Sequence, residues 1–262
     1  MAESSLAITF TELGEGVKTL TVNGPKLWAE GRAEVVGDDD ESAVRLVSCG
    51  PAFPSHTVAI HSADDANSST PLPDGQVGEI RIAGPSVMKG YWEDTEKTRE
   101  TFAGALLRTG DLGFLWEGHL YICGRSKEVV IVNGRNYYPQ DMEWEASKVA
   151  GVRKGNVIAF GARDPAGVER DRERVVIAFE VQEAALLENA ADLVQRVRRA
   201  VQEGMALTLD DAIPLAPGSL PKTSSGKLQR ARTRELYEAG ELAQRTPARD
   251  ASKLDLVKEA AK

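Results

Sequence analysis

The segment with the clearest chemical potential covers residues 217–230 and reads Pro-Gly-Ser-Leu-Pro-Lys-Thr-Ser-Ser-Gly-Lys-Leu-Gln-Arg. Its prolines, glycines and serines disfavour helix and strand, so we expect a mobile, irregular loop. Lys227 places a flexible ammonium group near the end of this loop, where it suits a phosphate or carboxylate ligand. The segment is not a Walker A motif, which needs a glycine where Pro221 stands. Taken alone, it also fits a solvated surface turn.

A second candidate is the run Arg-Thr-Gly-Asp-Leu-Gly at 108–113, which places the Asp111 carboxylate between two glycines. Such a carboxylate can accept hydrogen bonds from both hydroxyls of a ribose, and it can equally form an Asx turn. Other chemistries lack support, because His56, His61 and His119 do not have the spacing of metal ligands. No serine stands in the glycine-flanked elbow of a hydrolase either.

The composition is that of an ordinary globular protein, with 42% hydrophobic and 27% charged residues. The length of 262 residues allows one large domain or two modest ones. A formal net charge of −8 argues against nucleic-acid binding, which favours a basic face. The two cysteines form no metal or redox motif, residues 1–10 are not a signal peptide, and no apolar run is long enough to span a bilayer. We therefore expect a cytoplasmic protein.

Short strands separated by turns dominate the first half of the sequence and indicate a small β-barrel or sandwich. The clearest strand is 78–83, where Glu-Ile-Arg-Ile alternates polar and apolar residues, which predicts a half-buried strand. Residues 1–10 are also strand-like. The other predicted elements are strands at 19–22, 33–36, 44–48 and 57–61, a polar helix at 95–102, and two strands within 106–124 joined by a turn at Glu117-Gly118.

A second layout begins after Gly124 and predicts a compact α+β domain. Asn133-Gly134 is a hairpin turn signal between strands at 128–132 and 135–138. A helix follows, with Pro139 in its first turn. The remaining predictions are strands at 156–161 and 174–181, a helix with apolar residues at Leu193, Val194, Val197, Ala200 and Val201, a helix at 233–242, and a helical or frayed tail to Lys262.

Taken in order, these motifs resemble those of the adenylate-forming ligases. Residues 78–92 resemble the glycine-rich barrel motif of that family, 108–113 its ribose-binding motif, and 221–230 its catalytic lysine motif. Gly-Arg-Asn-Tyr-Tyr-Pro-Gln-Asp-Met-Glu at 134–143 is similar to the fatty-acyl-AMP ligase branch. An extra stretch at about 13–45 resembles the insertion of that branch.

The resemblance implies how the chain is organised. Residues 1–124 correspond to the rear of the N-terminal adenylation domain, a β-barrel-like subdomain that contains the insertion, and residues 125–262 to the mobile C-terminal domain. The fold class is therefore α+β. Met-Ala-Glu at 1–3 resembles the end of a family motif that lies well inside the N-terminal domain. We thus expect the chain to lack the upstream ATP phosphate loop and acyl tunnel, and to be inactive alone.

The resemblance also assigns roles to single residues, with ATP/AMP and Mg²⁺ as cofactors. Lys227 is the cation that bridges the substrate carboxylate and the α-phosphate. Asp111 holds the ribose hydroxyls with Arg125 as a donor nearby, and Ile122 lies near the adenine. Lys127 is the hinge between an adenylating and a thioester-forming pose. The carboxylate of Glu3 holds the Mg²⁺ ion.

The implied reaction converts a fatty acid to acyl-AMP and passes it to an acyl carrier protein or a polyketide synthase carrier domain. The insertion favours this acceptor over coenzyme A, since it can restrict domain rotation. Its apolar residues Leu20, Val22, Leu27 and Trp28 can bury, while Lys18, Lys26 and Arg32 can pair with the other domain. Two alternatives stay open: a fragment of an acyl-CoA synthetase, and a non-catalytic remnant or binding module.

Overall fold

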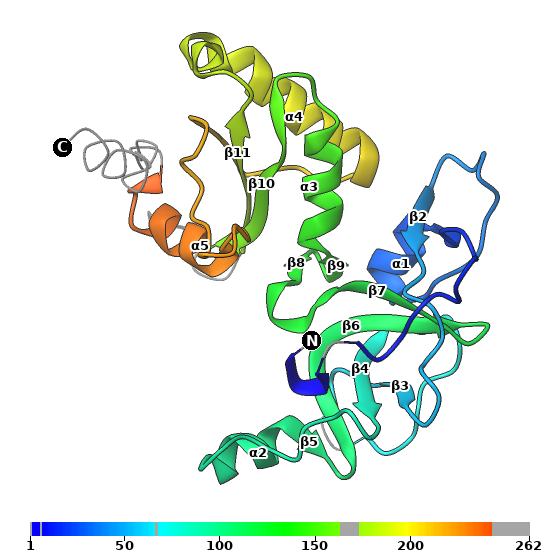
Figure 1. Ribbon diagram of the computed structural model, residues 1–262. Coiled ribbons are helices and arrows are strands. Elements are labelled where there is room, and N and C mark those ends of the chain that lie inside the picture. Colours follow the sequence, from blue (N-terminus) through cyan, green and yellow to red (C-terminus); the bar gives the residue numbers. More distant parts are fainter. Residues whose placement is uncertain (1, 6, 66–67, 163–172, 243–262) are drawn as a thin grey trace. The chain divides into compact units, whose positions relative to one another are not determined.

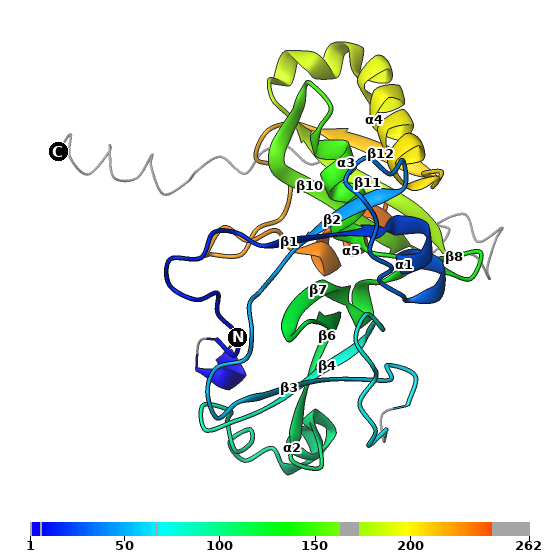
Figure 2. The same ribbon diagram turned by 90° about the vertical axis from the view of Figure 1, so that its right-hand side faces the viewer.

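The computed structural model describes residues 2–5, 7–65, 68–162 and 173–242 (Figures 1 and 2). The predicted helical tail that ends at Lys262 lies outside these residues. The chain divides into two compact units, Met1–Tyr138 and Pro139–Lys262. Both contain helices and sheets, which confirms the α+β class. None of the described helices combines the length and apolar character that crossing a bilayer requires.

The first unit is built on one five-stranded antiparallel sheet with β6 at its centre. Strand β6 pairs with β4 along one edge, and with β5 and then β7 along the other, while β3 extends the sheet beyond β4. The strands are β3 (Thr57–His61), β4 (Gly78–Ala83), β5 (Phe102–Ala103), β6 (Leu106–Trp116) and β7 (His119–Arg125), and helix α2 (Thr95–Thr101) precedes β5.

The sheets formed by the described strands are open, so the predicted β-barrel-like subdomain is not confirmed. An apolar cluster that includes Ile60, Ile80 and Leu107 packs on this sheet. The predicted turn at Glu117-Gly118 is confirmed between β6 and β7, and both residues have positive φ, as a type I′ hairpin turn requires.

The stretch that resembles an insertion forms a small layer of its own in the first unit. Strands β1 (Thr19–Asn23) and β2 (Ala43–Val47) pair antiparallel, and helix α1 (Gly24–Glu30) follows β1 directly. Sequence patterns missed α1, although Asn23 caps it by accepting a hydrogen bond from the Lys26 N–H at 3.0 Å. A proline in its first turn was a further signal. Residues 33–36 do not form the predicted strand, and among them only Val35 makes an isolated bridge, to Val22.

The side chains of this stretch bear out only part of the expectation. Val22, Leu27 and Trp28 are buried, and the Trp28 ring stacks on Tyr137 with 6.1 Å between centroids. The cations, by contrast, pair locally. Lys26 Nζ lies 2.5 Å and Arg32 Nη2 3.7 Å from Glu34 Oε2, and Lys18 Nζ lies 2.8 Å from Glu15 Oε2. Each of these cations therefore has an acidic partner within the stretch itself, and the pairing with the other domain stays a prediction.

The beginning of the chain is not the predicted strand. Ala2–Ser4 form a single 3₁₀ turn, η1, and Ser5 has a positive φ of 58°. The turn is held by the Met88 N–H, which donates to the Glu3 carbonyl at 2.8 Å, and by a 2.9 Å hydrogen bond between the Ser4 and Ser86 hydroxyls. These contacts replace the neighbouring strand that an extended segment would need.

A 3₁₀ turn and a hairpin end the first unit. They are η2 (Ser126–Glu128), β8 (Val130–Val132) and β9 (Arg135–Tyr137), and the predicted Asn133-Gly134 turn is confirmed between the two strands. Since Tyr137 stacks on Trp28, this hairpin packs with the first unit, and the two compact units meet in the sequence after Tyr138. The domain boundary at 124/125 stays a prediction. A hinge is defined by motion between two conformations, so the pivot at Lys127 stays a prediction.

The second unit contains a three-stranded sheet in the order β10-β11-β12. Strands β10 and β11 are antiparallel, whereas β11 and β12 are parallel and are joined through α4. The elements are α3 (Pro139–Ser147), β10 (Val152–Ala162), β11 (Arg174–Val181), η3 (Ala184–Asn189), α4 (Ala190–Met205), β12 (Asp211–Leu215) and α5 (Arg230–Glu238).

Helices cover both faces of this sheet. Helix α5 packs on the face that carries Ile158 and Phe160, while α3 packs on β10 and α4 (Figure 1). Strand β11 is buried along nearly its whole length, as expected for a strand between two layers. In α4 the predicted stripe is confirmed, because Leu193, Val197 and Val201 are buried.

Candidate functional site

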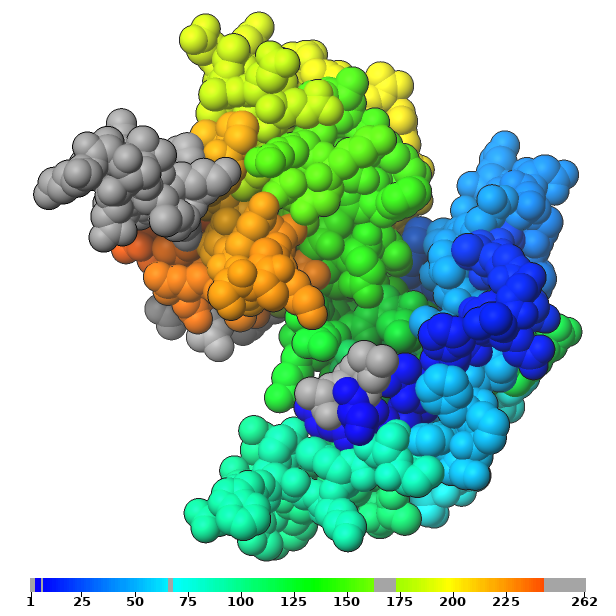
Figure 3. All heavy atoms as spheres, in the orientation of Figure 1, coloured from blue at the N-terminus to red at the C-terminus, as the bar shows by residue number. Residues whose placement is uncertain are grey.

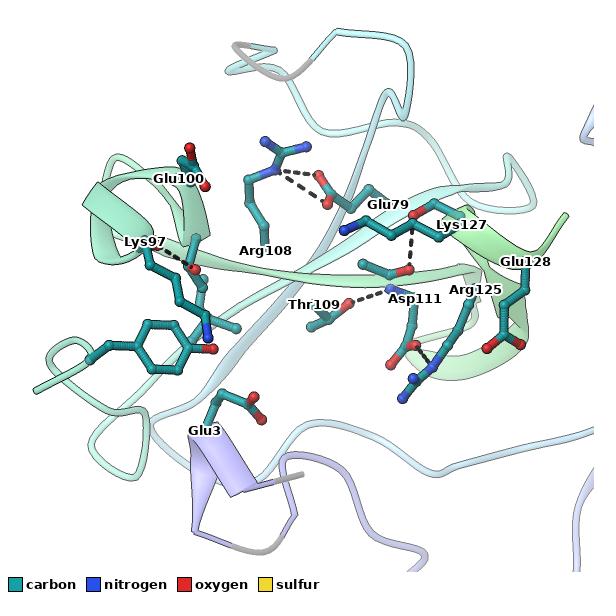
Figure 4. Close-up of a pocket in the computed structure, with 15 residues that line it drawn as sticks. Glu3, Glu79, Lys97, Glu100, Arg108, Thr109, Asp111, Arg125, Lys127 and Glu128 are labelled. Atoms are coloured by element: carbon teal, nitrogen blue, oxygen red, sulfur yellow. Dashed lines mark hydrogen bonds and ion pairs between the residues drawn. The ribbon is translucent and has the colours of Figure 1, made fainter. Parts of the chain in front are cut away.

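A cavity of about 870 Å³ in the first unit brings together four of the six predicted site residues. Asp111 comes from β6, Arg125 from the end of β7, Lys127 from η2 and Glu3 from η1 (Figure 4). The sheet positions the first two residues directly, since Asp111 and Arg125 are partners in the β6–β7 register. The carboxylates of Glu3 and Asp111 point into the same space.

An ion pair connects Asp111 and Arg125. Arg125 Nε donates to Asp111 Oδ1 at 3.1 Å, and the Asp111 side chain is 29% exposed against 67% for Arg125. Burial raises the pKa of Asp111, and the charge of Arg125 opposes that rise. The neighbouring carboxylates of Glu128 and Glu3 raise the pKa further.

A bulge in β6 presents Asp111 to the cavity. Glu79 pairs with Leu112, and Arg81 pairs with Arg108. Between these two pairs β6 contains more residues than β4, so β6 bulges there. Thr109 Oγ1 closes the bulge by donating to the Ile80 carbonyl at 2.7 Å and accepting from the Asp111 N–H at 3.0 Å. The glycine between them has a φ of 71°, which a larger residue would adopt only with strain.

A buried ionic network supports the start of this bulge, and sequence patterns missed it. Glu79 is 5% exposed and Arg81 is 1% exposed, so β4 is buried on both faces and the prediction of a half-buried strand is wrong. Glu79 Oε2 accepts from Arg81 Nε at 3.2 Å and from Arg108 Nε at 3.0 Å. These pairings let charged side chains occupy a buried position.

The other predicted residues occupy different places. Ile122 is 45% exposed on β7 and is not among the residues that line the cavity, so the structure does not group it with Asp111. Within the described residues no cluster of three or more potential ligands could hold a metal ion. Glu3 therefore offers a single carboxylate. This fits Mg²⁺, which is commonly held by one or two carboxylates together with substrate phosphates.

The lysine loop belongs to the second unit and is more ordered than its composition predicts. The lysine loop is orange in Figure 3, and Lys227 is exposed. The Thr223 N–H donates to the Lys227 carbonyl at 2.8 Å, and the Lys227 N–H donates to Thr223 Oγ1 at 3.0 Å. Gly226 allows this tight closure with a φ of 83°. The backbone is thus a closed turn rather than a loose loop, and the Lys227 side chain extends from it.

Comparison with known proteins gives this geometry a context. A family model described as AMP-binding enzyme matches residues 20–92. A medium-chain-fatty-acid–[acyl-carrier-protein] ligase of Moorena producens is 35% identical, over 93% of this chain and 42% of the relative. The chain belongs to the AMP-binding enzyme family.

Two further matches extend over the same length of this AMP-binding enzyme chain. A protein of Caulobacter vibrioides, provisionally named an acyl-CoA synthetase, is 36% identical over 92% of this chain and 40% of its own. A solved structure from work on fatty acyl-adenylate ligases of E. coli and L. pneumophila has a TM-score of 0.78 and 32% identity, and covers 93% of this chain and 42% of that one. The chain thus spans about two fifths of the length of the curated relatives it matches.

Proposed function

We propose that this chain supplies the ribose site and the catalytic lysine of a ligase that activates a fatty acid with ATP, forming acyl-AMP and pyrophosphate. The cavity shared by Glu3, Asp111 and Arg125, in a chain of the AMP-binding enzyme family, carries the proposal. Relatives named for fatty acids support the substrate class. Because the chain spans two fifths of those relatives, it acts within a longer enzyme, called the parent ligase below, and does not complete adenylation alone.

The ribose site rests on Asp111. One oxygen of its carboxylate accepts from Arg125, and the carboxylate is partly exposed toward the cavity. Two vicinal hydroxyls of a ribose can donate to such a carboxylate, and hydrogen bonds to a charged acceptor are about twice as strong as neutral ones. Arg125, which is largely exposed, both orients the carboxylate and offers further N–H donors to the nucleotide.

Nucleoside binding to the 262-residue chain should weaken as the pH falls, and the loss should begin above pH ~4, where an ordinary aspartate titrates. The reason is the raised pKa of Asp111: its carboxylate takes up a proton early and then accepts hydroxyl hydrogen bonds less well. Adenosine is the ligand to titrate, because the phosphate of AMP itself takes up a proton near pH ~6. Affinity that stays constant down to pH ~4 would contradict this assignment.

Glu3 is the residue that would hold Mg²⁺ beside the nucleotide phosphates. It lies in the cavity, and it has no ion pair to a cation among the described residues. The bound ion would neutralise phosphate charge and so ease the approach of a carboxylate. The 3₁₀ turn fixes the Glu3 backbone through Met88, which orients the side chain without using its oxygens.

Lys227 supplies the cation for the chemical step. Adenylation brings a carboxylate toward the α-phosphate, so repulsion between two anions and their alignment form much of the barrier. An ammonium group that contacts both reduces the repulsion and aligns the reacting atoms. The Lys227 ammonium has no ion pair among the described residues of the second unit, and its closed turn leaves it accessible.

Lys127 is proposed as the pivot between adenylation and thioester formation. It lies in the short 3₁₀ turn η2, directly after the end of β7, where a few residues can absorb a change in φ and ψ. Its neighbour Ser126 donates to the Gly110 carbonyl at 3.1 Å, so the sheet holds the residue before the pivot.

In the parent ligase, Lys127→Pro should slow transfer from acyl-AMP to the acceptor more than it slows acyl-AMP formation. Proline fixes φ near −65° and so removes the freedom that a pivot needs. Lys127→Ala is the matched control, because it removes the same charge but keeps φ free. Single-turnover measurements of each half-reaction decide the matter, and equal rates for the proline and alanine variants would place the pivot elsewhere.

The proposed acceptor is the phosphopantetheine arm of an acyl carrier protein. The stretch at about 13–45 is folded as β1, α1 and β2, and Trp28 packs it against β9, in the same unit as the proposed pivot. A folded layer there can limit the rotation that productive binding of coenzyme A needs. The relative from Moorena producens is named for an acyl carrier protein, which supports this acceptor. The relative from Caulobacter vibrioides is named for coenzyme A and favours the alternative.

Acceptor competition in the parent ligase separates these two candidates. With preformed acyl-AMP, we expect efficient thioester formation with a loaded acyl carrier protein and little with coenzyme A. Deleting residues 13–41 should raise the rate with coenzyme A, because the restricting layer is gone. If the intact enzyme already makes acyl-CoA efficiently, the acyl-CoA synthetase function replaces the one proposed here.

A further inference from the structure

A charged residue outside the roles assigned above, Glu180, lies near the end of β11, the central strand of the sheet in the second unit. Strand β11 is apolar from Val175 to Phe179, and Glu180 follows with 0% of its side chain exposed. Alternation places Glu180 on the same sheet face as Val176 and Ala178, which belong to the apolar cluster under α5. A buried carboxylate at such a position is costly unless each oxygen has a partner.

Each oxygen of Glu180 has one. Oε2 accepts from Arg153 Nη1 at 2.9 Å, and Oε1 accepts from the backbone N–H of Leu220 at 3.0 Å. Leu220 is 3% exposed and lies within the lysine loop of residues 217–230, immediately before Pro221. The carboxylate therefore fixes the backbone at Leu220, between the end of β12 at Leu215 and Pro221.

The rest of the loop is joined rigidly to this point. At its base, the Gln229 N–H donates to the Pro221 carbonyl at 3.0 Å, and Lys222 Nζ lies 2.6 Å from Asn156 Oδ1. Its C-terminal end continues into α5, where Arg230 donates to the Ala159 carbonyl at 2.7 Å and pairs with Glu143. Since the tip is closed by Thr223, a shift at Leu220 would be passed on to the backbone of Lys227.

We propose that Glu180 is a positioning residue, which holds the backbone of the lysine loop so that the Lys227 ammonium reaches the reacting anions. The inference rests on the proposed function of Lys227. Its physical basis is that misplacing a catalytic group by about 1 Å can cost about 10²-fold in rate. Arg153 contributes less to this positioning. Its side chain is 45% exposed, so water can solvate its guanidinium when Glu180 is replaced.

Three variants separate the hydrogen bond to Leu220 from the ion pair to Arg153. Glu180→Leu removes both and keeps a similar volume. Glu180→Gln keeps an amide oxygen that can accept from the Leu220 N–H, but it loses the charge. Arg153→Gln keeps the Leu220 hydrogen bond and removes only the ion pair. Lys227→Ala serves as the reference for complete loss of the cation.

The first measurement is hydrogen exchange in the 262-residue chain, which needs no activity. Glu180→Leu should speed exchange in peptides covering 218–229 by about tenfold or more, while peptides from β4 stay unchanged. Glu180→Gln and Arg153→Gln should stay close to wild type. Unchanged protection of 218–229 in Glu180→Leu would overturn the anchoring. If Glu180→Leu does not fold, slow exchange in Glu180→Gln supports the proposal and fast exchange contradicts it.

The second measurement is fatty-acid-dependent adenylation by the parent ligase. Glu180→Leu should lower kcat by about 10²-fold with little change in KM for ATP, because the nucleotide site is on the other unit. Glu180→Gln should recover most of the rate. A normal kcat in Glu180→Leu, or a loss confined to KM, would overturn the proposal. A normal rate in Lys227→Ala would instead overturn the proposed function of the lysine, and the exchange result would still stand.

Discussion

Replacing Lys227 with alanine should lower the rate of acyl-AMP formation by the parent ligase by a factor on the order of 10² or more. The reason is electrostatic: only adenylation brings a carboxylate against an α-phosphate, and the lysine is the cation assigned to that encounter. Transfer from preformed acyl-AMP to the acceptor should be much less affected. Single-turnover rates for the two half-reactions provide the measurement.

The matched control is Lys154→Ala, which removes another exposed lysine from the second unit. It should leave both half-reactions unchanged. Equal losses of rate in the two half-reactions of the Lys227→Ala enzyme would refute the assigned role. Only adenylation brings two anions together, so a cation needed equally in both steps has a different role.

Replacing Asp111 with alanine should weaken AMP binding to the 262-residue chain by about 10²-fold. The estimate follows from two hydrogen bonds to a charged acceptor, each worth about 1.5–3 kcal/mol, with part of that replaced by water. Calorimetric titration of wild type and variant gives the ratio directly. The bulge should survive the change, because Thr109 holds it through the backbone N–H at position 111 rather than through the carboxylate.

The ligand provides the matched control for this prediction. Dideoxy-AMP lacks both ribose hydroxyls, so it should bind wild type about as weakly as AMP binds Asp111→Ala. It should lose nothing more on going to the variant. If the variant discriminates between AMP and dideoxy-AMP as strongly as wild type does, Asp111 does not bind the ribose.

The local sequence pattern was sufficient to predict an element wherever residues close in the sequence determine which of its faces are buried. Strand β11 was predicted with the bounds that the structure shows, because its continuous apolar run leaves little choice of register. Asn133-Gly134 and Glu117-Gly118 were predicted as turns because few residues accept positive φ at both central positions. Asp111 was predictable as a candidate because its motif occurs in order with the other family-like motifs; taken alone, it fitted an Asx turn equally well.

Other features depend on contacts between distant segments and leave little trace in local pattern. In the sequence, Glu79 and Arg81 have the pattern of the solvent-exposed face of a strand. In the structure, β6 places Arg108 beside them and Glu79 pairs with both arginines. The sequence indicates that Glu180 needs buried partners, since it is a lone acid in an apolar strand. It does not indicate that the Leu220 N–H is the donor, because folding brings the two residues together. Strand β12 contains Pro214, which argues against a central strand; the structure places it at the sheet edge, where proline is tolerated.

The raised pKa of Asp111 belongs to the same class of unpredictable features. It comes from burial in the bulge and from the carboxylates of Glu128 and Glu3, which lie on two other elements. The sequence motif indicates only that an aspartate is present at this position. The pairing of β6 with β7 determines that Arg125 stands opposite and partly offsets the effect.

The claim on which the rest depends is that AMP binds in the cavity between β6, the end of β7 and η1. The most direct test is to follow backbone amide chemical shifts of the 262-residue chain during titration with AMP. We expect the largest changes at residues 109–111 and 125–127, and we expect Asp111→Ala to remove them. Binding that leaves these amides unchanged, or no binding at all, would contradict the account and leave a non-catalytic role for the chain.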